Sequence, residues 1–382
     1  MKLLYIGCND TFSRHELGFV AALNSLGSID VIVLGQKFNV RRINVASDNG
    51  KHVLTFYEVP AKNLQCVHYC VDTIKRFFRV NDYDVIFVTP RLPTLVARFL
   101  RNSSQQTILR LWSIRASKLK DNLAFGAYED IIVYIPSILA NFFYILGSSY
   151  AIAVDHATYL FALKAYSVLT NKIAKLYPPY GFIEKREDNN AQRVLDVVEC
   201  SDYVLGFTIL SKRGSYLKFE AKPHAVVLYR LAKKTPVDIV VAGSTYEDWK
   251  HVFPSFKPPK NLHIVGKGFG DDVVAELYRK SRVVISPITN RNISNRLLEA
   301  LFHSKPTVTT DIAKCIHPEL VHGEHVYMST WNNIVEDAVK LLKDEEILRT
   351  LGTGARRAYD LFFSAKRNAE FIKGLIFSKS SI

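Results

Sequence analysis

Short apolar runs alternate with amphipathic stretches along the first half of the chain. Several of these runs are continuous and rich in β-branched residues, which is typical of strands buried on both faces of a parallel sheet. The predicted strands are residues 3–6, 30–34, 53–59, 83–89 and 106–112. Between them, apolar residues recur at the spacing of an α-helix. The predicted helices are residues 15–26, 67–79 and 92–101.

The same alternation returns in the second half. Its predicted strands are residues 203–209, 237–242, 262–265, 283–288 and 306–310. Its predicted helices are residues 223–233, 271–280, a segment starting near 295, and residues 333–343, 345–361 and 365–377. Between the halves, Leu176–Arg193 combines a Pro-Pro turn with a charge-rich run and predicts a linker. Two doubly wound halves would place a ligand cleft between them, at the carboxyl ends of the strands.

One uncharged segment of 24 residues, 131–154, stands out in the first half. It is long enough to suggest a membrane-spanning helix. Pro136 and Asn141 interrupt it, however, and a Gly-Ser-Ser sequence precedes a new strand-like run at 151–154. We therefore expect a buried helix followed by a buried strand. A helix lying in a membrane interface is the second interpretation, and a spanning helix is the third.

Composition and charge narrow the function classes. With 382 residues, 48% of them hydrophobic, the chain is long enough for two folded domains and is not of the disordered or fibrous class. The net charge of +14 suits nucleotide phosphates, an anionic membrane surface or nucleic acid. Basic residues are not interleaved with aromatic ones, so nucleic acid is the least expected of these partners. The five cysteines show no metal-site spacing, which favours free thiols in a reducing cytoplasm.

The strongest candidate site begins at the helix predicted to open at Asn295. Helix starts offer unpaired backbone N–H groups and the positive end of the helix dipole, which together bind anions. Arg296 adds a guanidinium of the kind that phosphate favours. Glu299, about one turn further, could accept hydrogen bonds from a ribose diol. In the alternative interpretation, Glu299 only supports the helix start electrostatically and Arg296 is a solvated surface residue.

This part of the sequence resembles the C-terminal domain of group 1 (family 4) glycosyltransferases. The resemblance rests on HIVGKGFGDDVVAELYRKSRVVISP, RLLEALFHSKPTVTTDI and HPELVHGEHVYM, and in the first half on VDHATYLFALKAYSVLTNKIAKLYPPYG. It implies the α/β fold GT-B, in which two Rossmann-like doubly wound parallel-sheet domains face a central cleft. The implied division is an acceptor-binding domain 1–178, a linker 179–199, a nucleotide-sugar-binding domain 200–362 and a C-terminal helix 363–382 that crosses back to the first domain.

The resemblance also implies site residues. The family clamps the donor diphosphate with an Arg/Lys pair, for which Arg213 and Lys222 are the counterparts, and such a pair neutralises charge on the leaving group. The family's first glutamate in the E-x7-E pattern falls on Arg291, which could hold a phosphate instead. The implied donor-binding residues are Glu299, Arg296, Asn295, Ser294, Arg291, Lys267, Gly7 and Asp10.

The function expected from this resemblance is transfer of a sugar from a nucleotide diphosphate sugar to a glycan, lipid or protein acceptor, without metal or cofactor. The alternatives are a nucleotide-sugar epimerase and a non-catalytic protein that binds sugar nucleotides or polyanions. A retaining enzyme of this family needs no catalytic base, so none is assigned. An inverting enzyme would need Asp10, His15, Asp155 or His156 as its base, and for each of these a structural role is favoured over catalysis. We expect the protein in the cytoplasm, with at most a peripheral contact at the inner face of the membrane.

Overall fold

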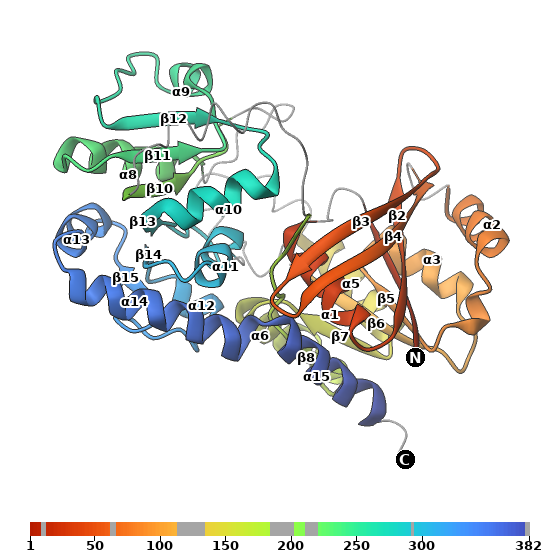
Figure 1. Cartoon of the computed structure of the whole chain (residues 1–382). Coiled ribbons are helices and arrows are strands. Elements are labelled where there is room, and N and C mark those ends of the chain that lie inside the picture. Colours follow the sequence, from red (N-terminus) through yellow and green to blue (C-terminus); the bar gives the residue numbers. More distant parts are fainter. Residues whose placement is uncertain are drawn as a thin grey trace. The chain divides into compact units, whose positions relative to one another are not determined.

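The computed structural model describes residues 1–8, 13–61, 66–112, 134–183, 202–210, 221–291 and 294–378. The chain divides into two compact units, each an α/β structure built on its own sheet (Figure 1). Of the described residues, unit 1 comprises those within 1–112, 134–183 and 362–378, and unit 2 comprises those within 202–361. The expected pair of α/β domains is confirmed.

Unit 1 contains a nine-stranded sheet of order β8-β7-β6-β5-β1-β2-β4-β3-β9. The strands are β1 (Lys2–Cys8), β2 (Ser28–Gly35), β3 (Asn39–Ser47), β4 (Gly50–Pro60), β5 (Val85–Val88), β6 (Gln106–Leu111), β7 (Tyr150–Ala153), β8 (Ile173–Lys175) and β9 (Gly181–Ile183). From β8 to β4 every neighbouring pair is parallel. Strand β3 is antiparallel to both β4 and β9, which corrects the expectation of a wholly parallel sheet.

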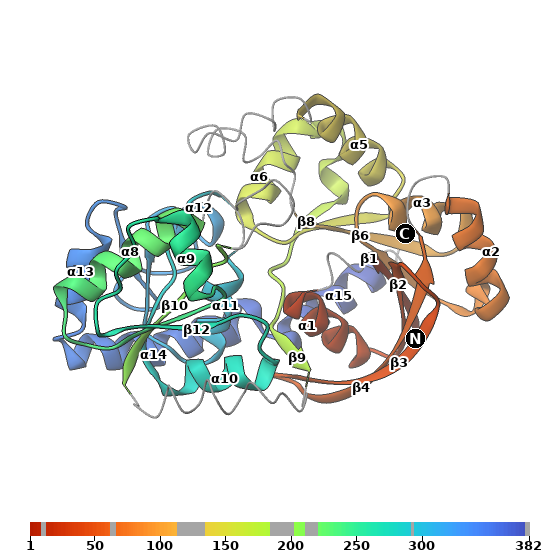
Figure 2. The same ribbon diagram turned by 90° about the horizontal axis from the view of Figure 1, so that it is seen from above.

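Helices cover both faces of this sheet (Figure 2). They are α1 (Arg14–Asn24), α2 (Val67–Phe77), α3 (Leu92–Leu100), α5 (Tyr134–Leu146), α6 (His156–Ala165) and α15 (Ala365–Phe377), with the short 3-10 helices η3 (Val80–Asp82) and η6 (Ser167–Lys172). One apolar core joins the sheet to α2, α3, α5 and α6, and the other joins it to α1 and α15. The last helix is fixed in unit 1, where the Asn368 side-chain amide donates to the Tyr177 carbonyl at 3.0 Å.

The uncharged segment forms a helix followed by a strand, as expected, but the helix is not buried. In α5 only Asn141 and Ile145 are buried, while several large apolar side chains face solvent. The following strand β7 is buried from Ala151 onward. Among the described residues, no helix is long and apolar enough to cross a membrane.

Unit 2 contains a six-stranded sheet of order β12-β11-β10-β13-β14-β15, in which all neighbouring pairs are parallel. The strands are β10 (Tyr203–Phe207), β11 (Ile239–Ala242), β12 (Leu262–Gly266), β13 (Ser281–Ile285), β14 (Thr307–Thr310) and β15 (Tyr327–Ser329). The helices are α8 (Ala221–Lys234), α9 (Tyr246–Val252), α10 (Asp271–Lys280), α11 (Asn295–Phe302), α12 (Ala313–Ile316), α13 (Ile334–Leu341) and α14 (Glu345–Ala358), followed by the π-helical turn η7 (Tyr359–Phe363). Two cores fill opposite faces, one lined by α8, α13 and α14 and the other by α10 and α11.

The segment expected as a linker is only partly described. Residues 181–183 form β9 and pair with β3, so this part belongs to the sheet of unit 1. The remaining residues of the expected linker, from 184 onward, lie outside the described residues.

Candidate functional site

The start of α11 lies where the sequence predicts it, after the loop that follows β13. The cap is Ser294, whose hydroxyl accepts the Leu297 amide at 3.3 Å. The Ser286 hydroxyl, just beyond β13, lies 3.4 Å from the Ser294 hydroxyl. A helix that starts at the carboxyl end of a parallel strand directs its N–H groups to the edge of the sheet where phosphate binds in such folds.

The loop between β13 and α11 is tied to the neighbouring strand β14. The Thr310 hydroxyl accepts the Ile288 amide at 3.1 Å and donates to the Ile288 carbonyl at 2.6 Å. The Thr309 hydroxyl donates to the Ser286 carbonyl at 2.8 Å. Arg291 is half-buried at the far end of this loop. These bonds fix the approach to α11, and a fixed approach keeps the helix start preorganised for a ligand.

Glu299 is almost completely buried one turn inside α11, with 2% of its surface exposed. Its Oε2 atom accepts from the Arg296 guanidinium at 2.5 Å and from the Tyr278 hydroxyl at 2.9 Å. The two donors hold the carboxylate in one orientation, and burial strengthens both contacts. Ser294 caps the helix, whereas the Glu299 carboxylate pairs with the side chains of Arg296 and Tyr278.

Aromatic rings support this arrangement from two sides. The Arg296 guanidinium lies over the Phe207 ring, 4.1 Å from its centroid, which also corrects the view of Arg296 as a solvated surface residue. The Tyr278 ring stacks on the His303 ring, with centroids 4.9 Å apart and planes at 10°. Phe207 ends β10 and Tyr278 belongs to α10, so three separate elements position one carboxylate and one guanidinium.

A second polar cluster lies just beyond the ends of β10 and β11, at the same edge of the sheet. Beyond β11, the Ser244 hydroxyl lies 2.6 Å from the Thr208 hydroxyl and accepts the Trp249 indole N–H at 2.8 Å. Gly243 has a φ of +95°, and a Cβ there would lie 2.5 Å from the Thr208 carbonyl oxygen. Only glycine fits this position, which brings the backbone of β11 close to that of β10.

Lys267 follows β12 and binds within unit 2. Its ammonium lies 3.0 Å from a carboxylate oxygen of Asp248 in the first turn of α9. Burial alone would raise the pKa of Asp248, but the Thr245 backbone amide and the Lys267 ammonium lower it below its ordinary value. Lys267 is thus a partner of the α9 start, and its expected donor contact stays a prediction.

Lys222 lies in the first turn of α8, exposed, with its ammonium 5.8 Å from the centroid of the Phe253 ring. It lines a surface hollow of about 740 Å³ together with side chains of α8 and of the Trp331–Glu336 region. Ser294, Arg296 and Glu299 do not line this hollow. Its expected partner Arg213, and Asp10 of unit 1, lie outside the described residues.

In unit 1, Gly7 lies near the carboxyl end of β1, where a Cβ would lie 2.8 Å from the Tyr5 ring. Tyr5 belongs to a buried polar cluster that the sequence did not reveal. The carboxylate of Glu16 accepts from the Tyr5 hydroxyl, the Trp112 indole and the Arg110 guanidinium. Burial and the nearby Glu16 carboxylate raise the pKa of Tyr5 well above its ordinary value. A side chain at position 7 would collide with the Tyr5 ring, so this cluster requires glycine there.

The other ionisable residues considered as bases have structural contacts. Asp155 is the buried cap of α6 and accepts the Thr158 amide at 2.6 Å. His15 lies 3.4 Å from the Pro179 carbonyl oxygen, and His156 lies 3.5 Å from the Lys175 ammonium. Within the described part of the chain, no cluster of three or more His, Cys, Asp or Glu residues could hold a metal ion.

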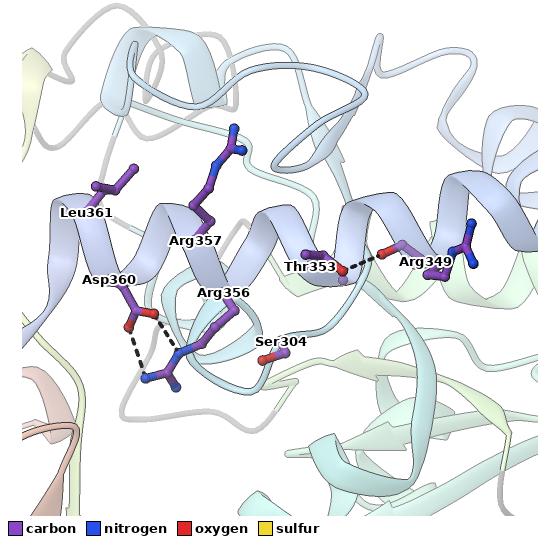
Figure 3. Close-up of a pocket in the computed structure, with 8 residues that line it drawn as sticks. Ser304, Arg349, Thr353, Arg356, Arg357, Asp360 and Leu361 are labelled. Atoms are coloured by element: carbon purple, nitrogen blue, oxygen red, sulfur yellow. Dashed lines mark hydrogen bonds and ion pairs between the residues drawn. The ribbon is translucent and has the colours of Figure 1, made fainter.

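A second hollow, of about 690 Å³, runs along α14 (Figure 3). Arg356 in its wall pairs with Asp360 and donates to the Phe302 carbonyl at 3.2 Å, and Arg357 pairs with Glu324. Ser304, also in the wall, follows the end of α11. The eight residues of α11 span about 12 Å, so this hollow lies at the opposite end of the helix from the Ser294 cap.

Comparison with known proteins gives a family match for part of unit 2. Residues 224–344, which include α10, α11 and β14, match the family described as "Glycosyl transferases group 1". Over this segment the chain is similar to the group 1 glycosyltransferases. A search of curated protein sequences gives no match to this chain.

Similarity to solved structures shows that the chain has the GT-B fold. Sucrose-phosphate synthase from Thermosynechococcus elongatus is 13% identical, with a TM-score of 0.70 over 100% of this chain and 99% of that one. Anabaena Alr3699/HepE in complex with UDP and glucose is 12% identical, with a TM-score of 0.63 over 100% of both chains. Trehalose-6-phosphate synthase OtsA is 10% identical, with a TM-score of 0.66 over 100% of this chain and 99% of that one.

Proposed function

We propose that this glycosyltransferase takes its sugar from a UDP-sugar donor held by unit 2. The observation that carries the proposal is the buried Glu299–Arg296–Tyr278 assembly at the start of α11, inside the segment that matches the family. UDP is the favoured nucleotide because UDP and glucose are bound in the similar Anabaena HepE structure.

Each part of the donor has a proposed partner. The diphosphate binds at the start of α11, where the Ser294–Arg296 backbone and the Arg296 guanidinium meet it. The ribose hydroxyls bind the Glu299 carboxylate. Lys222 and Arg213 neutralise the departing diphosphate, and Arg291, Asn295 and Lys267 complete the donor contacts. Gly7 and Asp10 of unit 1 stay predicted donor-binding residues.

We propose that the reaction needs neither a metal ion nor a cofactor. A departing nucleoside diphosphate develops negative charge that some cation must stabilise. Arginine and lysine side chains supply that charge here, so turnover should persist when divalent cations are chelated. The acceptor is a glycan, a lipid or a protein. The enzyme would work in the cytoplasm, with a peripheral contact at the inner face of the membrane.

The proposal is tested first by binding. A thermal-shift screen against UDP, GDP, ADP and dTDP should show the largest stabilisation with UDP. Arg296→Ala should lose most of this shift, whereas Arg349→Ala, a change at an exposed arginine of the hollow along α14, should keep it. Equal shifts for all four nucleotides, or none, would contradict the donor assignment.

A second assay tests the chemistry. Incubation of the enzyme with UDP-glucose and no acceptor should release UDP and glucose slowly, as water replaces the acceptor. Conversion of a UDP-sugar to its epimer in the same assay would identify an epimerase. Tight UDP binding with no consumption of any UDP-sugar would indicate a non-catalytic protein that binds sugar nucleotides.

A further inference from the structure

Helix α5 of unit 1 exposes a continuous apolar stripe. Ile135, Leu139, Phe143 and Leu146 are 65%, 54%, 59% and 47% exposed, and they recur at spacings of four, four and three residues. Residues at these spacings lie on one side of a helix. A soluble protein normally turns a polar face to water, so a helix that is apolar on both sides needs a second apolar environment.

The inner side of α5 packs against the core of unit 1. Ile145 is buried in the core of unit 1, and Ile138 and Phe142 pack against that core. The one buried polar side chain of α5, Asn141, donates to the Ser137 carbonyl at 2.7 Å and is satisfied within the helix. The outer side therefore offers apolar surface with little hydrogen-bonding specificity, which suits lipid better than the mixed polar rim of a protein interface.

Basic side chains predominate in the described stretch that contains the stripe. In residues 134–183, the single acidic residue is Asp155, and it is buried as the cap of α6. The same stretch contains Lys164, Lys172 and Lys175. Three further cations, Arg91, Arg98 and Arg101, lie in α3 or directly next to it.

Three of these cations are placed around α5. The Lys172 ammonium donates to the carbonyl of Leu146, the last residue of the helix, at 3.0 Å. The Arg91 guanidinium lies close enough to Tyr144 of α5 to oppose the rise that burial causes in its pKa. Lys164 is exposed on α6, which lies beside α5 on the same side of the sheet (Figure 2). Cations around an apolar stripe are the pattern that binds anionic lipid surfaces.

We propose that the outer side of α5 docks unit 1 on an anionic phospholipid membrane. The helix lies in the plane of the interface with Ile135, Leu139, Phe143 and Leu146 among the acyl chains. Its 13 residues span about 20 Å, shorter than the roughly 30 Å of a bilayer core, so the contact is peripheral. Arg91, Lys164 and Lys172 contact lipid phosphates. This inference specifies the membrane contact of the proposed function and is independent of the donor.

Vesicle co-sedimentation of the full chain tests the proposal. The enzyme should bind phosphatidylcholine vesicles that contain phosphatidylglycerol more tightly than pure phosphatidylcholine vesicles. Leu139→Gln/Phe143→Gln should weaken binding by about tenfold or more, where tenfold equals about 1.4 kcal/mol. The matched control is Val40→Gln/Val53→Gln, two exposed valines on β3 and β4 of the same unit, and it should bind like the wild type.

Three outcomes would overturn the proposal. The first is no binding to either vesicle. The second is binding that high salt abolishes and that Leu139→Gln/Phe143→Gln leaves unchanged, because charge alone would then explain it. The third is a wild-type dimer in light scattering that this variant makes monomeric, without vesicle binding, which would make the stripe a contact with a second copy. Both variants should keep the wild-type thermal shift with UDP, so a failure of docking is distinguishable from a failure of the donor assignment.

Discussion

Glu299→Ala should weaken UDP binding because it removes the proposed acceptor of the ribose hydroxyls. Hydrogen bonds to a charged group contribute about 1.5–3 kcal/mol, which corresponds to a Kd raised about 10- to 150-fold. The structure supports the upper part of this range, since Glu299 is buried and held by Arg296 and Tyr278. A preorganised carboxylate loses little entropy when the donor binds.

The same substitution removes an acceptor from Arg296 and Tyr278, so it also lowers the free energy of unfolding. Two variants separate these effects. Glu299→Gln keeps the shape of the side chain and removes its charge, and it should weaken UDP binding less than Glu299→Ala. Tyr278→Phe removes one of the two bonds that orient Glu299 but leaves the carboxylate, so it should change Kd by only a few-fold.

Isothermal titration with UDP gives Kd for each variant, and urea unfolding gives its stability. The reasoning is refuted if Glu299→Ala binds UDP within about twofold of the wild type while remaining folded. It is also refuted if Tyr278→Phe weakens binding as much as Glu299→Ala, because Glu299 would then act only through packing.

Three further predictions concern catalysis, stability and pH. Lys222→Ala should lower kcat more than it raises KM if Lys222 stabilises the departing diphosphate, and steady-state kinetics with a UDP-sugar would show a change in KM alone if it does not. Arg110→Met should cost about 3–5 kcal/mol in urea unfolding because it leaves the Glu16 carboxylate buried without its cation, and a loss under about 1 kcal/mol would contradict a charged pair. Burial lowers the pKa of His224 to about 4 from an ordinary value of 6.5. Between these two pH values, the unfolded chain therefore binds more protons at His224 than the folded chain does. The free energy of unfolding of the wild type should fall by up to about 3 kcal/mol as pH decreases from 7 to 4, and His224→Gln should lack this pH dependence.

The sequence predicted most elements of the fold because strands buried on both faces have a distinctive pattern. Strands β5 and β11 are fully buried and were predicted from their apolar runs. Strand β3 was missed because its first four residues are exposed and include Arg41 and Arg42, which do not resemble a buried strand. Strand β9 was missed because its three residues were taken as part of a linker, and only pairing with β3 defines it.

The candidate site was predictable where it depends on local sequence. The start of α11 follows from a strand, a loop and a polar cap, all within a short segment. The partners of Glu299 and Arg296 were not predictable, because Tyr278 comes from α10 and Phe207 from β10. The cluster around Glu16 was missed for the same reason, since Glu16 lies on α1 and Arg110 on β6, and no spacing rule relates the two.

The burial of α5 could not be predicted fully from its hydrophobic pattern. Amphipathicity identifies the buried side of a helix only when the other side is polar. Along α5, the inner residues Ile138, Phe142 and Ile145 and the outer residues Leu139 and Phe143 are all apolar, so the sequence supports burial of either side or both. Neither side of α5 carries a charged residue, which is why the sequence alone suggested a membrane span. A large exposed apolar side marks a contact surface, and the cations around α5 are the reason for proposing an anionic lipid surface as its partner.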